Sequence, residues 1–401
     1  MKASPTATSY FDWRIRNEDV NGEPIQLVTK PGQTGHHSTL YPEFLLAEHA
    51  ACAATDVVVN LECGAGLAGL VAARRAANGQ VILASPNLAD VLAARQSILF
   101  AGLTNVRVVH SSGVGVVEDR SVDIVVARNP KGRLPSLRTI LAGYRMLRPG
   151  GRFYLAGAGD EGIQSSLARV ERLFGSVQTL AYRKGCRIGL AIRPDRDFTL
   201  PNEFAVPVIR DNAFSRYEVT IDRGDFVVCS RPGVFSGDGL DPGAAALIEA
   251  TRINGAERVL DLGCGTGIVG AVAASHGHPL TVYQVDVDSD AIASAEETAR
   301  ASGVAGTTIL ASDSIAAVAD QRFDVVLANP PYHFGRETDF DVAHEFIRGS
   351  AAVLDSRGRA YLVANRFLPY EPAMSEHFAA VETVYLGSKF KVLLGRQPRQ
   401  R

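Results

Sequence analysis

The chain repeats itself at a fixed offset of 201 residues, and this repeat constrains its fold more than any other feature. The glycine-rich segment 59–67 (VNLECGAGL) aligns with 260–268 (LDLGCGTGI). Three further pairs keep the same offset: 31–32 with 232–233, 81–85 with 282–286, and 122–126 with 323–327. An offset of half the chain length, held across four segments, indicates two copies of one domain in tandem.

The two copies are predicted to be separate domains of the α/β class. A polar, proline-containing stretch at 193–201 has the composition of a linker, so we expect domains at residues 1–197 and 198–401. In each copy, short β-branched runs alternate with longer helical segments, which predicts a mostly parallel sheet with flanking helices. Ahead of the strands of the second copy, 217–221 and 226–229 flank a polar turn and predict a β-hairpin.

Composition excludes several classes of protein. No apolar run approaches the roughly 18 residues that a membrane-spanning helix needs, and the first residues lack the apolar core of a signal peptide. The five cysteines are scattered without metal-ligand spacing, as is typical of a reducing compartment. We therefore expect a cytoplasmic protein with no metal ion and no membrane partner.

The first copy is basic and the second is acidic. Residues 1–200 carry 23 Lys and Arg against 17 Asp and Glu, whereas residues 201–401 carry 18 against 26. A basic domain fits a polyanionic partner such as nucleic acid, although a solvated surface produces the same bias.

The second copy has a ligand-binding pattern at the ends of three predicted strands. The turn 261–267 (DLGCGTG) joins a buried-type strand to a helix, and its glycines let the backbone approach a ligand. A packing turn without a ligand is the alternative, because folds that bind other dinucleotides use similar turns. Asp286 ends the next strand, where a carboxylate accepts hydrogen bonds from ribose hydroxyls. Asp313 follows the third strand and either accepts a bond from an adenine amino group or caps a helix.

The tetrapeptide Asn329-Pro330-Pro331-Tyr332 ends the fourth predicted strand and indicates chemistry on an amino group. The prolines fix an extended backbone. The Asn329 side-chain oxygen and the Pro330 carbonyl can both accept hydrogen bonds from one NH₂, which orients the nitrogen lone pair toward a methyl donor. Tyr332 offers a flat face for a planar substrate. The predicted catalytic residues are Asn329, Pro330 and Tyr332, and the predicted cofactor-binding residues are Asp261, Gly263, Gly265, Gly267, Asp286, Asp313 and Asn329.

These motifs resemble class I methyltransferases that modify amino groups, and more specifically the bacterial ribosomal RNA guanine-N2 methyltransferases. The matching segments lie in the expected order at 232–241, 329–335, 346–349, 363–370 and 389–392. That family also has tandem methyltransferase domains, of which the first is degenerate. Tyr332 is a departure, because Phe is more usual there, but either ring can stack.

The resemblance implies two Rossmann-like domains with seven-stranded sheets, and S-adenosyl-L-methionine as the cofactor. It implies methyl transfer to guanine N2 in ribosomal RNA, 16S rather than 23S, by a monomer that acts on RNA or on a ribosomal subunit. Tyr332, Phe235 and Arg366 are expected to bind substrate. The alternatives are a 23S rRNA guanine-N2 methyltransferase, a protein glutamine N5-methyltransferase and a non-catalytic RNA-binding assembly factor. Further candidates for phosphate contacts near the crevice are Arg336, Lys389 and Lys391.

The first copy keeps the fold signature but loses the residues of the site. Asn60 stands in place of Asp261, and Glu62 stands in place of Gly263. Ser85 replaces the acid Asp286, so we expect no productive cofactor binding. The first copy is predicted to dock RNA, with simple packing against the second copy as the alternative. The predicted docking residues are Arg128, Lys131, Arg133, Arg138, Arg145, Arg148, Arg183, Lys184 and Arg187.

Overall fold

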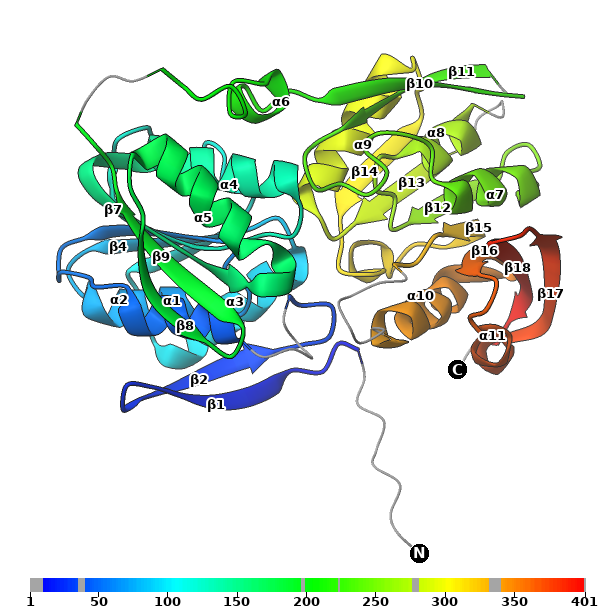
Figure 1. Cartoon of the computed structure of the whole chain (residues 1–401). Helices are drawn as coiled ribbons and strands as arrows, with labels where there is room; N and C mark the ends of the chain where they lie inside the picture. Colours follow the sequence, from blue (N-terminus) through cyan, green and yellow to red (C-terminus); the bar gives the residue numbers. More distant parts are fainter. Residues whose placement is uncertain are drawn as a thin grey trace, which may run out of the picture. The chain divides into compact units, whose positions relative to one another are not determined.

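The chain forms two compact units, Met1–Ala213 and Phe214–Arg401 (Figure 1). The computed structural model describes residues 10–34, 40–195, 199–222, 224–275, 281–331 and 340–399. The first unit extends beyond the predicted boundary at residues 197 and 198. Phe204 and Ile209 are the reason, because both are buried in the core of the first unit.

The second unit is built on a seven-stranded, mostly parallel sheet, as predicted. The strand order is β14-β13-β12-β15-β16-β18-β17. Only β18 runs antiparallel to its neighbours, β16 and β17. The strands are β12 (Arg258–Leu262), β13 (Thr281–Asp286), β14 (Thr307–Ala311), β15 (Phe323–Ala328), β16 (Leu354–Asn365), β17 (Phe378–Leu386) and β18 (Phe390–Pro398).

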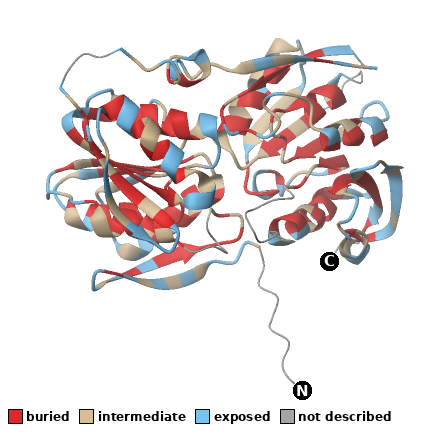
Figure 2. Cartoon of the chain, in the orientation of Figure 1, coloured by how far each residue is buried: buried red, intermediate tan, exposed pale blue. Residues whose placement is uncertain are grey.

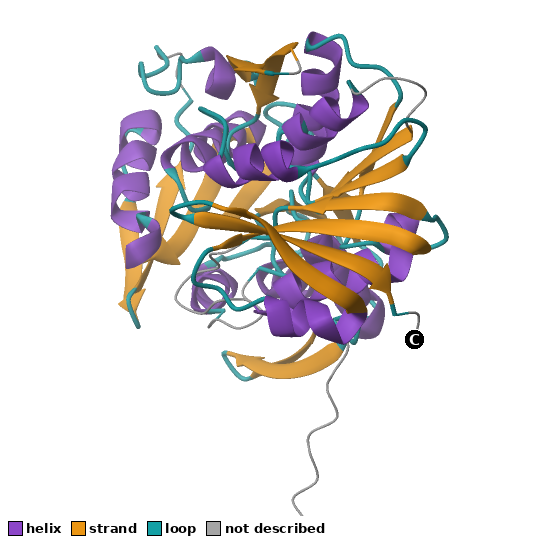
Figure 3. Ribbon diagram, turned by 90° about the vertical axis from the view of Figure 1, so that its right-hand side faces the viewer, coloured by secondary structure: helices purple, strands orange, loops and turns teal. Residues whose placement is uncertain are grey.

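Helices cover both faces of this sheet, which is why its central strands are apolar on both sides (Figure 3). One face carries α7 (Pro242–Ala250), α8 (Ile268–Ala274) and α9 (Ser289–Ala301), and the other carries the 3-10 turn η2 (Ala316–Val318), α10 (Phe340–Val353) and α11 (Glu371–His377). On α10, Ala343, Ile347 and Ala351 recur every four residues and form the buried stripe of that helix. Figure 2 shows the resulting concentration of buried residues in the strands.

The predicted hairpin forms a separate two-stranded sheet of β10 (Ser215–Ile221) and β11 (Gly224–Ser230). Three hydroxyls on α9 and its C-cap, spaced four residues apart, accept hydrogen bonds from backbone N–H groups in or directly after β11: Ser294 from Arg231, Thr298 from Cys229 and Ser302 from Val227. These bonds occupy the outer edge of β11. The loop that follows β11 therefore starts at a backbone position that is hydrogen-bonded to α9.

The first unit repeats the second element by element. Its sheet order is β5-β4-β3-β6-β7-β9-β8, and from β1 to β6 each helix and strand begins 201 residues before its counterpart. The strands are β1 (Arg14–Val20), β2 (Glu23–Thr29), β3 (Val57–Leu61), β4 (Gln80–Ser85), β5 (Val106–His110), β6 (Val122–Arg128), β7 (Leu147–Ala158), β8 (Gln178–Arg183) and β9 (Cys186–Ile192). The helices are α1 (Tyr41–His49), α2 (Leu67–Arg75), α3 (Leu88–Ala101), α4 (Arg133–Met146), η1 (Gly159–Glu161), α5 (Ile163–Phe174) and α6 (Pro207–Arg210). The predicted duplication is confirmed.

The strand order fixes where a ligand can lie. In the second unit, the first strand of the large sheet is β12, which lies in the middle of that sheet. The chain then adds β13 and β14 on one side of β12 and returns to add β15 on the other side. The connections after β12 and β15 consequently leave the sheet toward opposite faces, and a crevice opens at the carboxyl ends of these two strands. None of the helices in the described ranges has the length and apolar character to cross a membrane.

Candidate cofactor and amino-group site

The glycine turn between β12 and α8 has one open position. Gly263, Gly265 and Gly267 all have positive φ, at +77°, +54° and +78°. A Cβ on Gly267 would lie 2.6 Å from the Ala295 Cβ, and one on Gly263 would lie 2.8 Å from the Phe346 ring. A Cβ on Gly265 would meet no atom within 4 Å among the described residues. Packing therefore explains two of the glycines, whereas Gly265 faces open space and fits the close approach of a ligand.

Asp261 connects the sheet to the helix that follows the turn. Its side chain is buried, and Oδ2 accepts a hydrogen bond of 2.9 Å from the Gly270 N–H. Burial raises the pKa of Asp261 to about 7, and the nearby Asp286 acts in the same direction. The carboxyl group thus ties β12 to α8 and holds the turn in place. Direct contact between Asp261 and the cofactor remains a prediction.

Asp286 lies beside the open position of the turn. Its Oδ2 accepts a hydrogen bond of 2.9 Å from the Gly265 N–H, and its Oδ1 accepts one of 3.0 Å from the Asp288 N–H. These bonds fix the orientation of the carboxylate at the end of β13. Two features that the sequence placed 21 residues apart therefore form one site, at the position expected for the ribose.

Asp313 lies at the end of the neighbouring strand β14 and is buried, with 2% of its surface exposed. The Ser312 N–H donates to the Asp286 carbonyl oxygen over 2.8 Å, so the two strand ends lie side by side. The order of acids along this edge matches the predicted order for ribose and adenine. The role of Asp313 itself is a prediction.

Asn329 is held from the opposite side of the crevice by Asp241, a residue absent from the predicted site. The Asn329 Nδ2 group donates to Asp241 Oδ2 over 3.1 Å, and the same oxygen accepts a hydrogen bond of 2.9 Å from the Ala244 N–H at the start of α7. Asn329 Oδ1 is buried without a hydrogen-bond partner among the described residues. Gly243 lies beside it, since a Cβ there would be 3.5 Å from Oδ1.

The sequence signal for Asp241 is local and points to a different role. An Asp directly before Pro242 is typical of a helix N-cap, and Asp241 does cap α7. Its bond to Asn329 joins residues 88 positions apart. Such a contact depends on how α7 packs on the sheet, which no local pattern reports.

Some of the residues predicted to contact substrate or phosphate lie outside the described residues, and the others are described. Tyr332 lies outside the described residues, as does Arg336. Phe235 is 65% exposed in the loop after β11. Burial, with Asp238 nearby, raises the pKa of Tyr217 to about 12, so its hydroxyl stays protonated and donates to the Ser236 carbonyl over 3.0 Å. This bond anchors the loop next to Phe235.

A basic and aromatic turn follows β16, at the same edge of the sheet as Asn329. Arg366 is exposed, and its N–H donates to the Lys389 carbonyl over 2.8 Å. Phe367, which the sequence did not single out, is 85% exposed. Lys391 is instead buried and forms an ion pair of 2.6 Å with Glu371, so it is not placed to meet a phosphate.

The first unit fills the corresponding positions with its own side chains. Gly64 corresponds to the open Gly265, but a Cβ on Gly64 would collide with the Glu43 carboxylate. Arg128 stands at the position of Asn329 and pairs with Glu161 over 3.1 Å. Burial raises the pKa of Glu43 to about 8, against a smaller opposing effect of Arg128. The first unit therefore lacks the open face that Gly265 gives the second.

Several predicted docking residues of the first unit are not available at its surface. Arg128 is partly buried in its ion pair, and Arg138 has 3% of its surface exposed. Arg148 and Arg183 are exposed but form ion pairs with Asp123 and Glu48. Lys131, on the connection from β6 to α4, and Arg133, the first residue of α4, are exposed.

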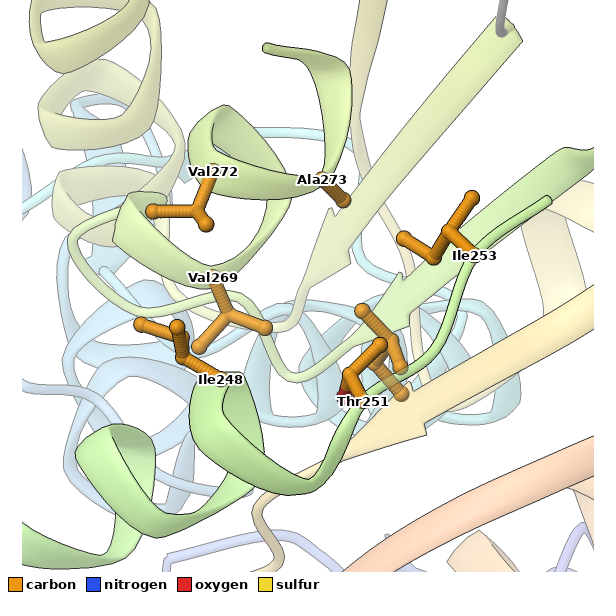
Figure 4. Close-up of a pocket in the computed structure, with 7 residues that line it drawn as sticks. Ile248, Thr251, Ile253, Val269, Val272 and Ala273 are labelled. Carbon is orange, nitrogen blue, oxygen red and sulfur yellow. The ribbon is translucent and has the colours of Figure 1, made fainter. Parts of the chain in front are cut away.

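A small cavity in the second unit is lined by none of the predicted site residues (Figure 4). Its volume is about 10 Å³, roughly that of one water-sized probe. It is lined by Ile248, Thr251, Ile253, Val269, Val272, Ala273 and Leu327. A cavity of this size and lining is a packing gap. Within the described ranges, no cluster of three or more His, Cys, Asp or Glu side chains is arranged to hold a metal ion.

The strand order, the glycine turn after the central strand, the acid after the next strand and the Asn-Pro-Pro segment together define a class I methyltransferase domain. The chain belongs to the methyltransferase small domain family, whose model matches residues 25–189 and 225–394. The family resemblance expected from the motifs is thereby confirmed.

Named relatives and a solved structure show which methyltransferases this chain resembles. The ribosomal RNA small subunit methyltransferase C of Shewanella halifaxensis is 32% identical over 278 residues, which cover 68% of this chain and 77% of that protein. The protein of the same name from Klebsiella pneumoniae is 37% identical over 183 residues, covering 46% and 52%. The structure of the T. thermophilus 16S rRNA N2 G1207 methyltransferase (RsmC), in complex with AdoMet and guanosine, superposes with a TM-score of 0.80. It is 26% identical and covers 96% of this chain and 98% of that one.

We predict that Gly265→Ala abolishes cofactor binding while costing about 1–2 kcal/mol of stability, because it adds a methyl group to the open face at a positive φ. Gly303→Ala is the matched control. Gly303 has a φ of +66°, and a Cβ there would also meet no atom within 4 Å among the described residues, but it follows α9, away from the turn. Calorimetric titration with S-adenosyl-L-methionine and thermal unfolding measure both effects. Equal losses of affinity in the two variants would contradict the assignment.

We predict that Glu43→Gln stabilises the first unit at alkaline pH. The folded chain holds the Glu43 proton to higher pH than the unfolded chain, so its contribution to stability is full below about pH 4.5 and is lost as the pH rises through about 8. The shift corresponds to at most about 5 kcal/mol. Denaturant unfolding at about pH 5 and about pH 9 tests this.

Trp13, the only tryptophan, lies in the first unit and provides a fluorescence signal for it. Glu171→Gln, an exposed change on α5, is the control and should leave the pH profile as it is. A profile for Glu43→Gln that matches the parent chain would show that the Glu43 carboxyl does not carry the effect.

Proposed function

We propose that this chain is a cytoplasmic, monomeric enzyme that transfers a methyl group from S-adenosyl-L-methionine to the exocyclic N2 amine of a guanine in 16S rRNA. The observation that carries the proposal is the state of Asn329. Its amide is fixed by Asp241, and its Oδ1 is a buried acceptor with no hydrogen-bond partner among the described residues. A buried acceptor without a partner is costly, and an N–H of the substrate would satisfy it. The names of the relatives supply the substrate class.

The described residues fit the cofactor. Gly265 leaves room over the turn, and Asp286 stands beside it with a fixed carboxylate. The carboxyl edge of the sheet carries the acids Asp261, Asp286 and Asp313, which suits a ligand with a sulfonium and an ammonium group. When bound, S-adenosyl-L-methionine supplies an electrophilic methyl group.

The residues of the second unit position the amine. Asn329 Oδ1 accepts one N–H of the guanine amine, and the Pro330 carbonyl accepts the other. The two hydrogen bonds would leave the nitrogen lone pair free to face the methyl donor. The nitrogen would gain the methyl group as the methyl–sulfur bond breaks, and would then lose one proton to water; the positive charge that develops on it would be stabilised by the two oxygens. Phe367 offers a stacking face, and Arg366 a positive charge, for a neighbouring nucleotide.

The first unit is proposed to dock the RNA rather than to bind the cofactor. Glu43 occupies the space above its glycine turn, and Ser85 stands where the second unit has Asp286. The Ser85 hydroxyl is engaged with Asp90 over 2.8 Å. The exposed cations Lys131, after β6, and Arg133, at the start of α4, are the best placed of the predicted docking residues. The first 200 residues also carry the excess of positive charge.

The direct test is methyl transfer from labelled cofactor to naked 16S and 23S rRNA and to both ribosomal subunits, taken from cells that lack this gene. Digestion and mass analysis identify the methylated nucleoside. N2-methylguanosine in 16S rRNA is the expected product. The same nucleoside in 23S rRNA would move the assignment to the other rRNA, and label only in protein would support glutamine methylation. Failure to bind S-adenosyl-L-methionine would leave the non-catalytic assembly factor.

We expect Asn329→Ala to keep cofactor affinity within about twofold and to lower turnover by about 100- to 1,000-fold, because it removes one acceptor for the developing charge. Calorimetric titration and single-turnover methyl transfer measure the two quantities separately. If affinity and turnover fell in parallel, Asn329 would belong to the cofactor site and not to the amine site.

We expect the charge reversal Lys131→Glu with Arg133→Glu to weaken RNA binding and to reduce the slope of log affinity against log salt by about 1–2, because two phosphate contacts are lost. Arg95→Glu with Arg107→Glu changes the net charge equally at other exposed positions of the first unit. Filter binding across a salt series compares the two pairs. Identical slopes for the two pairs would show that the effect comes from net charge, and would contradict docking through Lys131 and Arg133.

A further inference from the structure

One carboxylate oxygen connects the two sides of the crevice in the second unit. Asp241 Oδ2 accepts hydrogen bonds from the Ala244 N–H over 2.9 Å and from Asn329 Nδ2 over 3.1 Å. Asp241 precedes α7, on one face of the sheet, whereas Asn329 directly follows β15. We infer that Asp241 is a positioning residue that orients the Asn329 amide for catalysis. This inference rests on the proposed function.

The first argument is one of orientation. An amide can rotate by half a turn at little steric cost, which exchanges its donor and its acceptor. An ionised carboxylate only accepts hydrogen bonds, so Asp241 requires that the Nδ2 group of Asn329 face it. Oδ1 is then directed away from Asp241. In the other orientation Asn329 would present an NH₂ group to the substrate NH₂, and two donors would face each other.

The second argument is electrostatic. A hydrogen bond from an amide to an ionised carboxylate is stronger than a neutral one, and it polarises the amide so that the carbonyl oxygen becomes more negative. The effect on Asn329 Oδ1 gains importance as positive charge develops on the substrate nitrogen. Asp241 is therefore expected to act on the rate of methyl transfer more than on the binding of either substrate.

The third argument comes from the duplicated unit. Leu40 stands at the position of Asp241, and Arg128 stands at that of Asn329, so both partners of the bond are replaced together. Helix α1 nevertheless forms without any side-chain cap, whereas α7 is capped by Asp241. A helix at this place in the fold does not require an Asp cap. The carboxylate in the second unit is explained by the contact with Asn329.

The test uses a variant that separates capping from positioning. Asp241→Ser keeps a good N-cap but has a side chain one bond shorter, which cannot reach Asn329. We expect cofactor affinity, RNA affinity and melting temperature to stay close to those of the parent chain. Turnover should fall by about 10- to 100-fold, in line with the loss of one charge-assisted bond. Asp241→Asn retains an acceptor oxygen without the charge and should lie between the two.

A double-mutant cycle shows whether Asp241 acts through Asn329. Adding Asp241→Ser to Asn329→Ala should lower turnover by less than about threefold, because the group to be oriented is already absent. Additive losses in the double variant would overturn the inference. A fall in melting temperature for Asp241→Ser that accounts for its loss of turnover would reduce Asp241 to a helix cap.

A second measurement does not depend on activity. In protein labelled with ¹⁵N at asparagine, Asn329→Ala identifies the side-chain NH₂ signals of Asn329. These protons should exchange slowly with water in the parent chain, and should move and exchange faster in Asp241→Ser. Unchanged signals would overturn the inference even if the enzyme were fully active. If the parent chain methylated no RNA, the proposed function would fail, while these signals would still report whether Asp241 holds the amide.

Discussion

The reversal of strand order beside the first strand of each sheet is the constraint on which the rest of the structure depends. In the second unit it forces the connections after β12 and β15 to leave toward opposite faces. The glycine turn and Asn329 therefore meet at one crevice although the sequence separates them widely. The hydrogen bonds of Asp286 and Asp241 then fix the two sides of that crevice.

The sequence was sufficient for features that depend on neighbours along the chain. The glycine turn, Asp286 and Asn329 each follow a strand, and their backbone geometry is local. Features that depend on packing were not predictable in this way. The first unit extends past the predicted boundary because Phe204 is buried in its core. Arg138, which was predicted to dock RNA, is buried on α4. Asp241 carried the local signature of a helix cap, and its bond to Asn329 follows only from how α7 packs on the sheet.

The site places opposite electrostatic demands on the chain. A cationic cofactor favours the acids Asp261, Asp286 and Asp313 along the edge of the second sheet, whereas a polyanionic RNA is repelled by them. Residues 201–401 carry 18 basic against 26 acidic side chains, and residues 1–200 carry 23 against 17. The proposed function would resolve this conflict by placing the two tasks on separate units, with the cofactor on the acidic unit and the attraction for RNA on the basic unit.

The buried Glu43 of the first unit also has a consequence for evolution. Its carboxyl group occupies the space above Gly64. Among the nearby charges, that of Arg128 has the largest effect on the pKa of Glu43, and Arg128 stands where the second unit has Asn329. An asparagine at that position would remove the nearby charge that lowers the pKa of Glu43, so the buried carboxyl group would hold its proton to still higher pH. A small residue at position 43 would open the space above Gly64 and would leave Arg128 in its ion pair with Glu161. In evolutionary terms, a change at position 43 alone would open the first turn, whereas a change at position 128 alone would leave it closed.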